Sequence, residues 1–523
     1  MKILKFFSLN RSEIVLLSIV FLAAIIFRVA YIWDYNIHFY FDQSRDAYQS
    51  LQIYQKGDFK IQGPSASGTN DTVYHGVLYY YLIGFFYFLS SGNPVVPNIA
   101  IIVVAASSML PVFLLAKKIF KSNLVGWLSV LLLTASSDQI MFSVALANTT
   151  LLIPLLAWFY YLLWTIFIEK NYKYLPFLAL IFGLCNQSAV FSLYLVSNIL
   201  GIYGWFSYKR RRLLLGTFRH YLLSVFIYLL TISTMLLTQY KLWKAGIFDP
   251  FNTVTSVQSS RPLDTVILDS LSFLSKKLEF ILFPTNPEIS LLVASILLII
   301  GLALLFSNKK NGLLYLWFLS PLLLVALTAK SSYHISVGVS AGFYILLASM
   351  LAKISHKTWG RVATIMFLAI YLYSNLTYLL VIKNQRGDKL SVQSGGMLGD
   401  QLDLIEKTYT DNPDRSFSIA TLTGPHGMNT TWSYLYQWYG VEKYGYVPTW
   451  FGADQKGIPA GEYLTNVSHP EKTHYVIYEP NPGSSPDTRE EFRELQTIYA
   501  GDPLETVIFD KLVLEKRSSV DAK

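Results

Sequence analysis

Residues 14–33, IVLLSIVFLAAIIFRVAYIW, form an apolar run long enough to cross a membrane, and residues 41–46, FDQSRD, follow shortly after it. A membrane helix needs about 17–25 residues to cross a ~30 Å hydrocarbon core. The two carboxylates and the arginine of the second stretch therefore lie at the membrane surface or line a polar cavity. Because charged side chains are costly near lipid, these residues are the first candidates for a functional site.

The composition of the whole chain is that of a membrane protein. Of its 523 residues, 53% are hydrophobic and 14% are charged, whereas soluble domains average about 25% charged residues. The sequence predicts a mainly α-helical, polytopic membrane bundle, which makes the lipid bilayer one of its partners. We predict eleven spans, at residues 14–33, 96–116, 123–137, 148–168, 173–189, 190–207, 218–240, 289–307, 312–329, 333–352 and 359–382.

The distribution of charge predicts how these spans are oriented. Cytoplasmic loops are enriched in Lys and Arg. With a cytoplasmic N-terminus, the inner segments hold 18 of the 29 Lys and Arg residues before residue 384, and 11 of the 13 Asp and Glu residues fall outside. We therefore expect the chemistry on the extracytoplasmic face of the cytoplasmic membrane.

Residues 75–90, HGVLYYYLIGFFYFLS, are apolar but short and rich in aromatic side chains. Counting them as a crossing would place Lys117 and Lys118 outside and invert every later basic loop. A helix lying at the outer interface preserves the charge bias, and tyrosine is enriched at that depth. The first outer loop then covers residues 34–95, and a second long outer loop covers residues 241–288.

The C-terminal part of the chain, residues 384–523, has a different character, with 13 Lys and Arg against 20 Asp and Glu. It contains β-rich and helical stretches, which predict a small α/β domain after a transmembrane domain of residues 1–383. Eleven spans place this domain outside. Its aromatic stretch, Trp432 to Tyr439, binds sugar, lies on the membrane, or forms a core helix. The β-rich runs are residues 417–422, 473–478 and 506–514, and the helical stretches lie near 398–409, 431–444 and 488–497.

The chain contains no nucleotide-binding glycine motif and no Walker sequence. An extracytoplasmic site also has no access to cytosolic nucleotides. We therefore expect neither a nucleotide-sugar donor nor a nucleic acid partner.

The order of the polar motifs resembles a known group of enzymes. Asp42-Gln43 follows the first span, and then come Gly57-Asp58-Phe59 and His75-Gly76-Val77-Leu78-Tyr79-Tyr80. Over the first 190 residues the chain is similar to the C-type superfamily of membrane glycosyltransferases, close to the protein O-mannosyltransferase and aminoarabinose transferase group. Those proteins typically have Asp-Glu, Gly-Asp-Trp and His/Lys-Pro-Pro-Leu-Tyr-Tyr at these places. The resemblance implies a polyprenyl-phosphate-linked sugar as donor, and substrate-binding roles for Asp58, His75 and Tyr79.

Two departures from the family pattern matter for the site. Gln43 stands where the family has glutamate and cannot act as a base at neutral pH, so Asp42 alone inherits that role. Asp46 supplies a second carboxylate on the same face if the segment is helical, because residues i and i+4 share a face. Gly76-Val77 replaces the proline pair.

Sugar transfer also gives Asp42 a role on chemical grounds. In an inverting route a carboxylate takes the proton of the acceptor hydroxyl while the lipid phosphate leaves, through an oxocarbenium-like state. The leaving phosphate gains from cationic or hydrogen-bonding partners. Arg45 either binds that phosphate or forms an ion pair with Asp42 or Asp46. Further candidate ligands on the outer side are Arg261, Lys276, Lys277, Lys330, Tyr333 and His334.

Three other polar residues have two interpretations each. Asn148 opens the fourth predicted span, where family members often place Asp or Asn near the acid of the first outer loop, but asparagine is also a good helix N-cap. Gln187 either faces a cavity or bonds a neighbouring helix. His75 binds substrate, or holds a divalent metal with Asp71 or Asp58, although no tight His/Cys ligand spacing is present. No cofactor is certain.

The sequence therefore favours a glycosyltransferase that moves a hexosyl or pentosyl group from a polyprenyl phosphate to a lipid, glycan or protein acceptor. The alternative is a transporter or flippase for a lipid-linked saccharide. That class places charged residues at mid-membrane and often has inverted repeats. Here the spans hold few charges, Arg28 being a deep one. A non-catalytic scaffold would not need Asp42 beside the membrane.

Overall fold

The computed structural model describes residues 9–66, 72–210, 218–248, 262–307, 311–328, 333–384, 396–412, 416–480 and 484–519. The chain divides into two compact units, and each unit draws on separate stretches of the sequence. Unit 1 consists of Met1–Val29, Lys60–Tyr79 and Ile101–Val381, and unit 2 of Ala30–Phe59, Tyr80–Ala100 and Ile382–Lys523.

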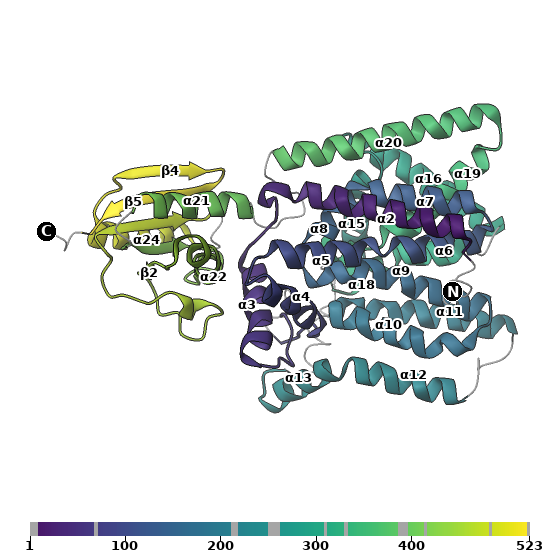
Figure 1. Ribbon diagram of the computed structural model, residues 1–523. Helices are drawn as coiled ribbons and strands as arrows, with labels where there is room; N and C mark the ends of the chain where they lie inside the picture. Colours follow the sequence, from purple (N-terminus) through teal and green to yellow (C-terminus); the bar gives the residue numbers. More distant parts are fainter. Residues whose placement is uncertain are drawn as a thin grey trace. The chain divides into compact units, whose positions relative to one another are not determined.

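Unit 1 is a bundle of helices that lie roughly side by side (Figure 1). Its core is made by aromatic and polar side chains together: Tyr160 stacks on Trp317 with ring centroids 4.6 Å apart, and Asn198 donates to the Tyr160 hydroxyl. Its described helices are α2 (Arg11–Tyr31), α6 (Met109–Phe120), α7 (Asn123–Ala135), α8 (Ser137–Val144), α9 (Leu152–Leu163), α10 (Leu175–Ser188), α11 (Leu195–Arg210), α12 (Phe218–Thr231), α13 (Ser233–Lys244), α15 (Leu263–Ile281), α16 (Pro287–Ser307), α17 (Gly312–Leu319), α18 (Pro321–Thr328), α19 (Ser340–Ile354) and α20 (Thr358–Asn384). Short helical turns are η2 (Asn148–Leu151), η3 (Trp164–Ile168), η4 (Tyr172–Tyr174), η5 (Val190–Tyr194) and η7 (Tyr333–Ser336), and α5 (Val95–Ala106) runs from unit 2 into unit 1.

The described helices confirm a polytopic membrane bundle. Four helical stretches are long and apolar enough to cross a membrane: Arg11–Tyr31, Val95–Phe120, Asn148–Ile168 and Thr358–Asn384. Two bent pairs, α7 with α8 and α12 with α13, pass the same test together. The number of eleven spans and their orientation stay predictions.

The apolar run after residue 75 forms α4 (Leu78–Leu89), which has 12 residues. At 1.5 Å per residue it extends over about 18 Å, less than the ~30 Å of a hydrocarbon core. Its length therefore suits a helix that does not cross the membrane.

Two predicted spans are bent, and polar side chains support both bends. The predicted span 123–137 ends at Ser136, where the chain turns by 59° into α8. The Ser136 hydroxyl accepts the N–H of Gln139 and so caps the new helix. The predicted span 218–240 bends by 60° after Thr231, and the Thr231 carbonyl accepts a hydrogen bond from Gln187.

The predicted outer loop 241–288 contains a 19-residue helix, α15. Its sequence, LDTVILDSLSFLSKKLEFI, carries five charged residues. A search for long apolar runs therefore does not find this helix. In the structure one charged side chain of this helix, Lys277, is buried, and the helix packs against α16 and α18.

Unit 2 contains a five-stranded sheet in the order β2-β1-β3-β5-β4. Strand β1 pairs in parallel with β2 and β3, whereas β5 pairs antiparallel with β3 and β4. The predicted run 506–514 is in fact a hairpin that turns at Asp510-Lys511, with Asp510 at positive φ. The strands are β1 (Ser418–Leu422), β2 (Thr449–Trp450), β3 (Thr473–Tyr478), β4 (Glu505–Phe509) and β5 (Leu512–Ser518).

Helices cover both faces of this sheet, as an α/β domain requires. Successive side chains of a strand point to opposite faces. On one face Tyr475 bonds Asn412, at the end of α21 (Leu398–Thr410). On the other face Tyr478 packs against Phe492 of α24 (Pro486–Ala500). The predicted fold class of the C-terminal segment is confirmed, while its boundary at residue 384 stays a prediction.

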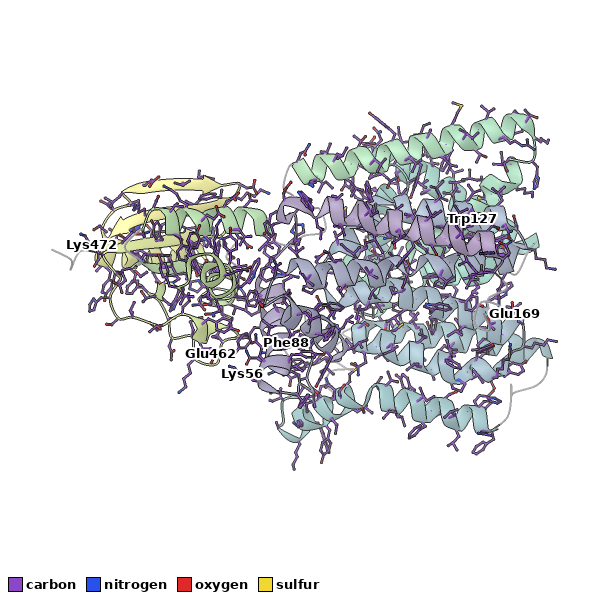
Figure 2. The ribbon with its side chains drawn as sticks, in the orientation of Figure 1. Lys56, Phe88, Trp127, Glu169, Glu462 and Lys472 are labelled. Atoms are coloured by element: carbon purple, nitrogen blue, oxygen red, sulfur yellow. The ribbon has the colours of Figure 1, made fainter. Side chains whose placement is uncertain are left out.

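Part of the first-loop segment, residues 34–95, belongs to the same unit as the sheet. Ile37 and Phe39 exchange backbone hydrogen bonds with Leu398 and Gly396. The Tyr434 hydroxyl, from α22 (Thr430–Leu435), donates to the carbonyl of Gly92. Figure 2 shows Lys56 and Glu462, whose charged groups lie 3.4 Å apart.

The aromatic stretch from residue 432 to 439 lies mainly in the interior of unit 2. Trp432, Tyr434 and Tyr436 are each at most 1% exposed and Trp438 is 6% exposed. The stretch runs through α22 and the π-helical turn η8 (Tyr436–Gly440), followed by α23 (Val441–Tyr444). Of the three interpretations, the core helix is the one that these side chains show.

A carboxylate beside the sheet makes the stability of unit 2 depend on pH. Glu479 follows β3 and accepts hydrogen bonds from the Gly424 N–H (2.9 Å) and Trp432 Nε1 (3.1 Å). Burial raises the pKa of its carboxyl to about 7, although both hydrogen bonds lower it in part. A folded-state pKa above the unfolded value stabilises the protein at low pH, and this stability is lost as the pH rises through about 7.

We expect Glu479→Gln to remove this loss. The free energy of unfolding of the variant, relative to that of the wild type, should be about 1–3 kcal/mol higher at pH 8 than at pH 5. Thermal unfolding of the purified protein at the two pH values measures the effect. Glu494→Gln, an exposed glutamate on α24, is the control. An identical difference between wild type and Glu479→Gln at both pH values would contradict the assignment.

Candidate active site

The residues of the FDQSRD stretch begin helix α3 (Phe41–Lys56). Gln43 caps this helix, because its side-chain carbonyl accepts the N–H of Tyr40 at 3.1 Å. The helix ends at Gly57, which adopts a left-handed conformation with φ of 67°. The residue that replaces the family's glutamate therefore has a local structural role in this chain.

Arg45 connects two carboxylates of α3. Its NH1 lies 2.8 Å from Oδ1 of Asp42, and its Nε and NH2 donate to Oδ1 of Asp46 at 2.9 and 2.8 Å. The expected ion pair thus forms with both acids, and the helical segment places them on one face as predicted. We call Asp42, Arg45 and Asp46 the α3 cluster.

The two acids of the α3 cluster have different environments. The Asp42 side chain is 67% exposed, whereas that of Asp46 is 6% exposed. The hydroxyl of Tyr80, from α4, donates to Oδ1 of Asp46 at 3.1 Å. Burial raises the pKa of Asp46 to about 6, although the Arg45 charge lowers it in part. The charges of Asp46 and Asp42 raise the pKa of Arg45, against the opposite effect of burial.

Tyr80, which contacts the α3 cluster, was not singled out from the sequence. The resemblance pointed to Tyr79, which is buried in α4 next to it. Both tyrosines belong to the matched segment, so the motif located the region. The face of α4 that carries the contact depends on how the helix packs.

The structure separates Asp58 from the other acids of the same loop. Asp58 lies just past the C-terminus of α3 and its N–H bonds Gln52, while Asp42 lies in the first turn. Over 16 residues the helix extends about 24 Å. Asp58 is therefore not part of the α3 cluster, and its substrate-binding role stays a prediction.

His75 lies in unit 1 with a second set of polar contacts. Its Nδ1 accepts the N–H of Val190 at 3.0 Å. The next residue, Gly76, donates its N–H to the Gln187 carbonyl, and a Cβ at Gly76 would overlap the Gln187 side chain. Gln187 also donates to Thr234, on α13. The helix-bonding interpretation of Gln187 is thus the one observed.

Asn148 belongs to the same part of unit 1. Its Nδ2 donates to the carbonyl of Ser188 at 2.7 Å, so it connects the start of η2 with the end of α10. The residue before η2 is Ala147, and no side chain caps this turn. The N-cap interpretation is therefore wrong, because Asn148 already lies inside the turn.

The remaining predicted ligands are described only in part. Arg261, Lys330 and Asp71 lie outside the described residues. Tyr333 and His334 form the turn η7, and the Tyr333 side chain is not among those described. Within the described ranges no three His, Cys, Asp or Glu residues are grouped so as to hold a metal ion, and the proposed roles of these residues stay predictions.

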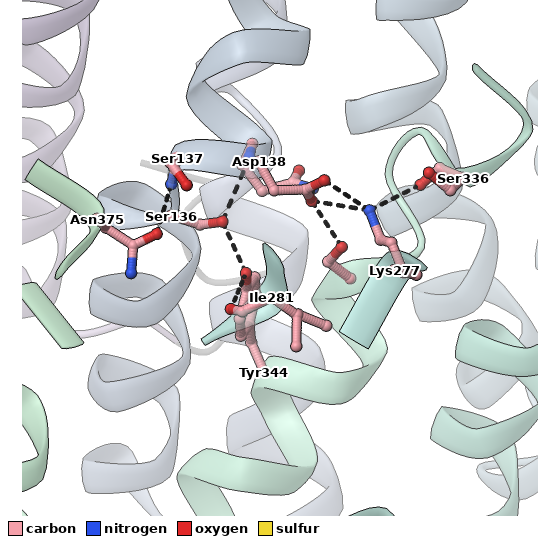
Figure 3. A network of polar contacts seen from close by, with 10 residues as sticks. Ser136, Ser137, Asp138, Lys277, Ile281, Ser336, Tyr344 and Asn375 are labelled. Carbon is pink, nitrogen blue, oxygen red and sulfur yellow. Dashed lines mark hydrogen bonds and ion pairs between the residues drawn. The ribbon is translucent and has the colours of Figure 1, made fainter. Parts of the chain in front are cut away.

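A buried ion pair that the sequence did not predict connects α8 with α15. Lys277 Nζ lies 2.7 and 2.9 Å from the two carboxylate oxygens of Asp138, and the two side chains are 3% and 1% exposed. Ser340 also donates to this carboxylate. Figure 3 shows the pair within a wider network that includes Ser136 and Tyr344. The Lys277 ammonium is therefore occupied, which argues against its role as a phosphate ligand.

We expect Lys277→Ala to destabilise the protein by about 3–5 kcal/mol, because it leaves the Asp138 charge buried without a partner. The double change Lys277→Met and Asp138→Leu should restore most of that loss, since hydrophobic replacements of a whole buried pair are often neutral. Thermal unfolding in detergent measures both. The neighbouring exposed Lys276→Ala is the control, and equal stability of the two alanine variants would contradict this account.

Comparison with known families found a match over part of the chain. The sequence model of the dolichyl-phosphate-mannose-protein mannosyltransferase family matches residues 74–237. This stretch contains His75, Tyr79 and Tyr80 and extends into α13. Together with the fold, it confirms the resemblance to the C-type superfamily of membrane glycosyltransferases.

Two solved structures share the fold over nearly the whole chain. They are ArnT from Cupriavidus metallidurans bound to undecaprenyl phosphate, and the same protein in the apo state. The first has a TM-score of 0.60 at 10% identity and covers 97% of this chain and 98% of ArnT. The second has a TM-score of 0.59 at 10% identity and covers 96% and 97%. At this identity the likeness concerns the fold. No curated protein matches the chain by sequence.

Proposed function

We propose that this chain is a membrane glycosyltransferase that moves a sugar from a polyprenyl phosphate to an acceptor hydroxyl, with Asp42 as the general base. The observation that carries the proposal is the α3 cluster, which combines an exposed carboxylate and a guanidinium. The family match and the fold supply the class of reaction. ArnT was solved with undecaprenyl phosphate, which supports a lipid phosphate as the donor here.

The geometry of Asp42 suits a base. One oxygen, Oδ1, binds Arg45, and this contact fixes the carboxylate. The described residues offer no contact to Oδ2, so that oxygen is available to an acceptor hydroxyl. Because the side chain is exposed, a substrate reaches it without displacing protein.

Arg45 has donors left for a phosphate. A guanidinium carries five N–H groups, and the two carboxylates of α3 use three of them. The remaining donors suit a phosphate oxygen, for which planar N–H pairs are well shaped. Arg45 thus orients the base and stabilises the charge that develops on the leaving group.

The proposed step is a direct displacement at the anomeric carbon. The acceptor oxygen forms a bond to this carbon while the bond to the phosphate oxygen breaks. The acceptor proton passes to Asp42 Oδ2, and the electron pair of the broken bond leaves with the polyprenyl phosphate. The charge bias predicts that this occurs on the extracytoplasmic face of the cytoplasmic membrane.

We expect Asp42→Asn to reduce transfer at least 100-fold, because the amide cannot accept the proton. The assay incubates the purified protein with short-chain polyprenyl-phosphate sugars and measures the release of polyprenyl phosphate. Asp502→Asn, which changes an exposed acid of unit 2, is the control.

Transfer by Asp42→Asn at the wild-type rate would refute the base assignment. If the wild type releases nothing from any donor, the enzyme class itself fails. Flipping of a labelled lipid-linked sugar in vesicles then tests the transporter alternative.

We expect wild-type activity to fall as the pH drops through about 6, because Asp46 becomes protonated there and Arg45 loses one of its two charged partners. Asp46→Asn should lack the part of the profile that titrates near pH 6 and should have a lower plateau. Rate profiles from pH 5 to 8 measure this. If the Asp46→Asn variant still loses activity as the pH drops through 6, the titrating group is not Asp46.

A further inference from the structure

Helices α10 and α12 run in the same direction and pack closely toward their C-terminal ends. Near their C-terminal ends Phe182 stacks on Tyr228 with ring centroids 5.0 Å apart, and a Cβ at Gly183 would meet Thr231 at 2.8 Å. Hydrogen bonds from Asn186 and Gln187 to α12 strengthen this contact.

Toward their N-terminal ends the same two helices enclose a groove of about 720 Å³. Its apolar lining comes from both helices, and Phe177 and Leu223 are 57% and 43% exposed. We call this the α10–α12 groove. Its lining residues are Lys173, Pro176, Phe177, Leu180, Arg219, His220, Leu223 and Ile227.

The outer surface of α12 indicates that the groove faces lipid. Phe218, Leu222 and Phe226 are exposed by 81%, 61% and 61%, and no residue of this helix is fully buried. In a membrane bundle such a surface contacts acyl chains.

Two cations lie at the mouth of the groove. Lys173 and Arg219 are both exposed, and neither has an acidic partner among the described residues. Each cation lies four residues before an apolar residue of the groove lining. Lys173 precedes Phe177, and Arg219 precedes Leu223. The groove thus combines two cations with an apolar lining, which complements a lipid with an anionic headgroup.

The groove lies at the end of unit 1 where α2 begins. Lys118 pairs with Glu169, and Lys117 with Glu13 near the start of α2. The start of α10 follows Glu169 within a few residues, so the groove shares that end. The charge bias predicts that Lys173 and Arg219 lie on the cytoplasmic side and Asp42 on the outer side, which makes the sugar donor a poor candidate for this groove.

We propose that the α10–α12 groove binds an anionic phospholipid, with Lys173 and Arg219 on the headgroup phosphate and one acyl chain between the helices. This is a structural lipid site distinct from the proposed site of transfer, and it does not depend on the transfer activity. The bound lipid belongs to the leaflet that the charge bias predicts to be cytoplasmic.

The test is lipid retention by the purified full chain. The protein is exchanged into detergent that contains equal amounts of phosphatidylglycerol, phosphatidylcholine and undecaprenyl phosphate, and the bound lipid is counted by native mass spectrometry. We expect the wild type to retain phosphatidylglycerol over phosphatidylcholine at least fivefold. The double variant Lys173→Gln with Arg219→Gln should lose that preference.

Two further variants separate the groove from general surface charge. Lys353→Gln with Arg361→Gln, which neutralises two exposed cations outside the groove, should keep the preference within twofold. Leu180→Trp, which fills the groove and keeps its charges, should reduce retention as strongly as the double variant.

Three outcomes would overturn the proposal. In the first, Lys173→Gln with Arg219→Gln keeps the preference for phosphatidylglycerol. In the second, Lys353→Gln with Arg361→Gln loses that preference to the same extent. In the third, the lipid that the groove double variant loses is undecaprenyl phosphate and not phosphatidylglycerol. A melting temperature for each variant shows that a loss of lipid is not a loss of fold.

Discussion

One guanidinium organises the proposed site, because Arg45 binds two carboxylates that lie one helical turn apart. Without that charge between them, Asp42 and Asp46 would repel each other on the same face of α3. The arrangement makes the two acids unequal. Asp46 is buried and receives the Tyr80 hydroxyl, so it fixes Arg45, and Arg45 in turn fixes the exposed Asp42. The two carboxylates thus differ in their surroundings: the buried Asp46 anchors the guanidinium, and Asp42 is exposed to the solvent.

The same electrostatic rule acts inside unit 1 for a different purpose. A lysine and an aspartate taken out of water are tolerated only as a hydrogen-bonded pair, and Asp138 meets this condition with Lys277, Ser340 and Gln139. The pair connects α15 to the bend between α7 and α8, where Ser136 and Asn375 supply the remaining contacts. The pair thereby connects a helix with five charged residues to the interior of the bundle.

The apolar runs and the composition were enough to predict the membrane bundle and the α/β domain. The i, i+4 spacing placed Asp42 and Asp46 on one face only on the condition that their segment is helical, and the structure supplies that helix. These patterns were not enough for features that arise only when distant segments meet. At the bend after Thr231 the carbonyl of that residue accepts a hydrogen bond from Gln187, 44 residues away. The burial of Lys277 in α15 likewise involves Asp138, a partner from a distant segment. Likewise the motif Tyr79-Tyr80 located the region of contact with Asp46, but only packing decides which tyrosine turns toward it. Asn148 is a further case, since its partner Ser188 comes from another helix.

Gly76 carries a consequence for how this sequence can vary. Its backbone lies against Gln187 so closely that no side chain fits, and Gln187 is itself held by Thr231 and Thr234. The related enzymes typically have a proline pair in this segment, and a proline ring at residue 76 would strike the glutamine. The backbone Cα of Gln187 also lies only 2.7 Å from the place that a Cβ of residue 76 would take, so a smaller side chain at residue 187 would not make room. A chimaera that brings a proline into this loop must therefore also shift the backbone at the end of α10.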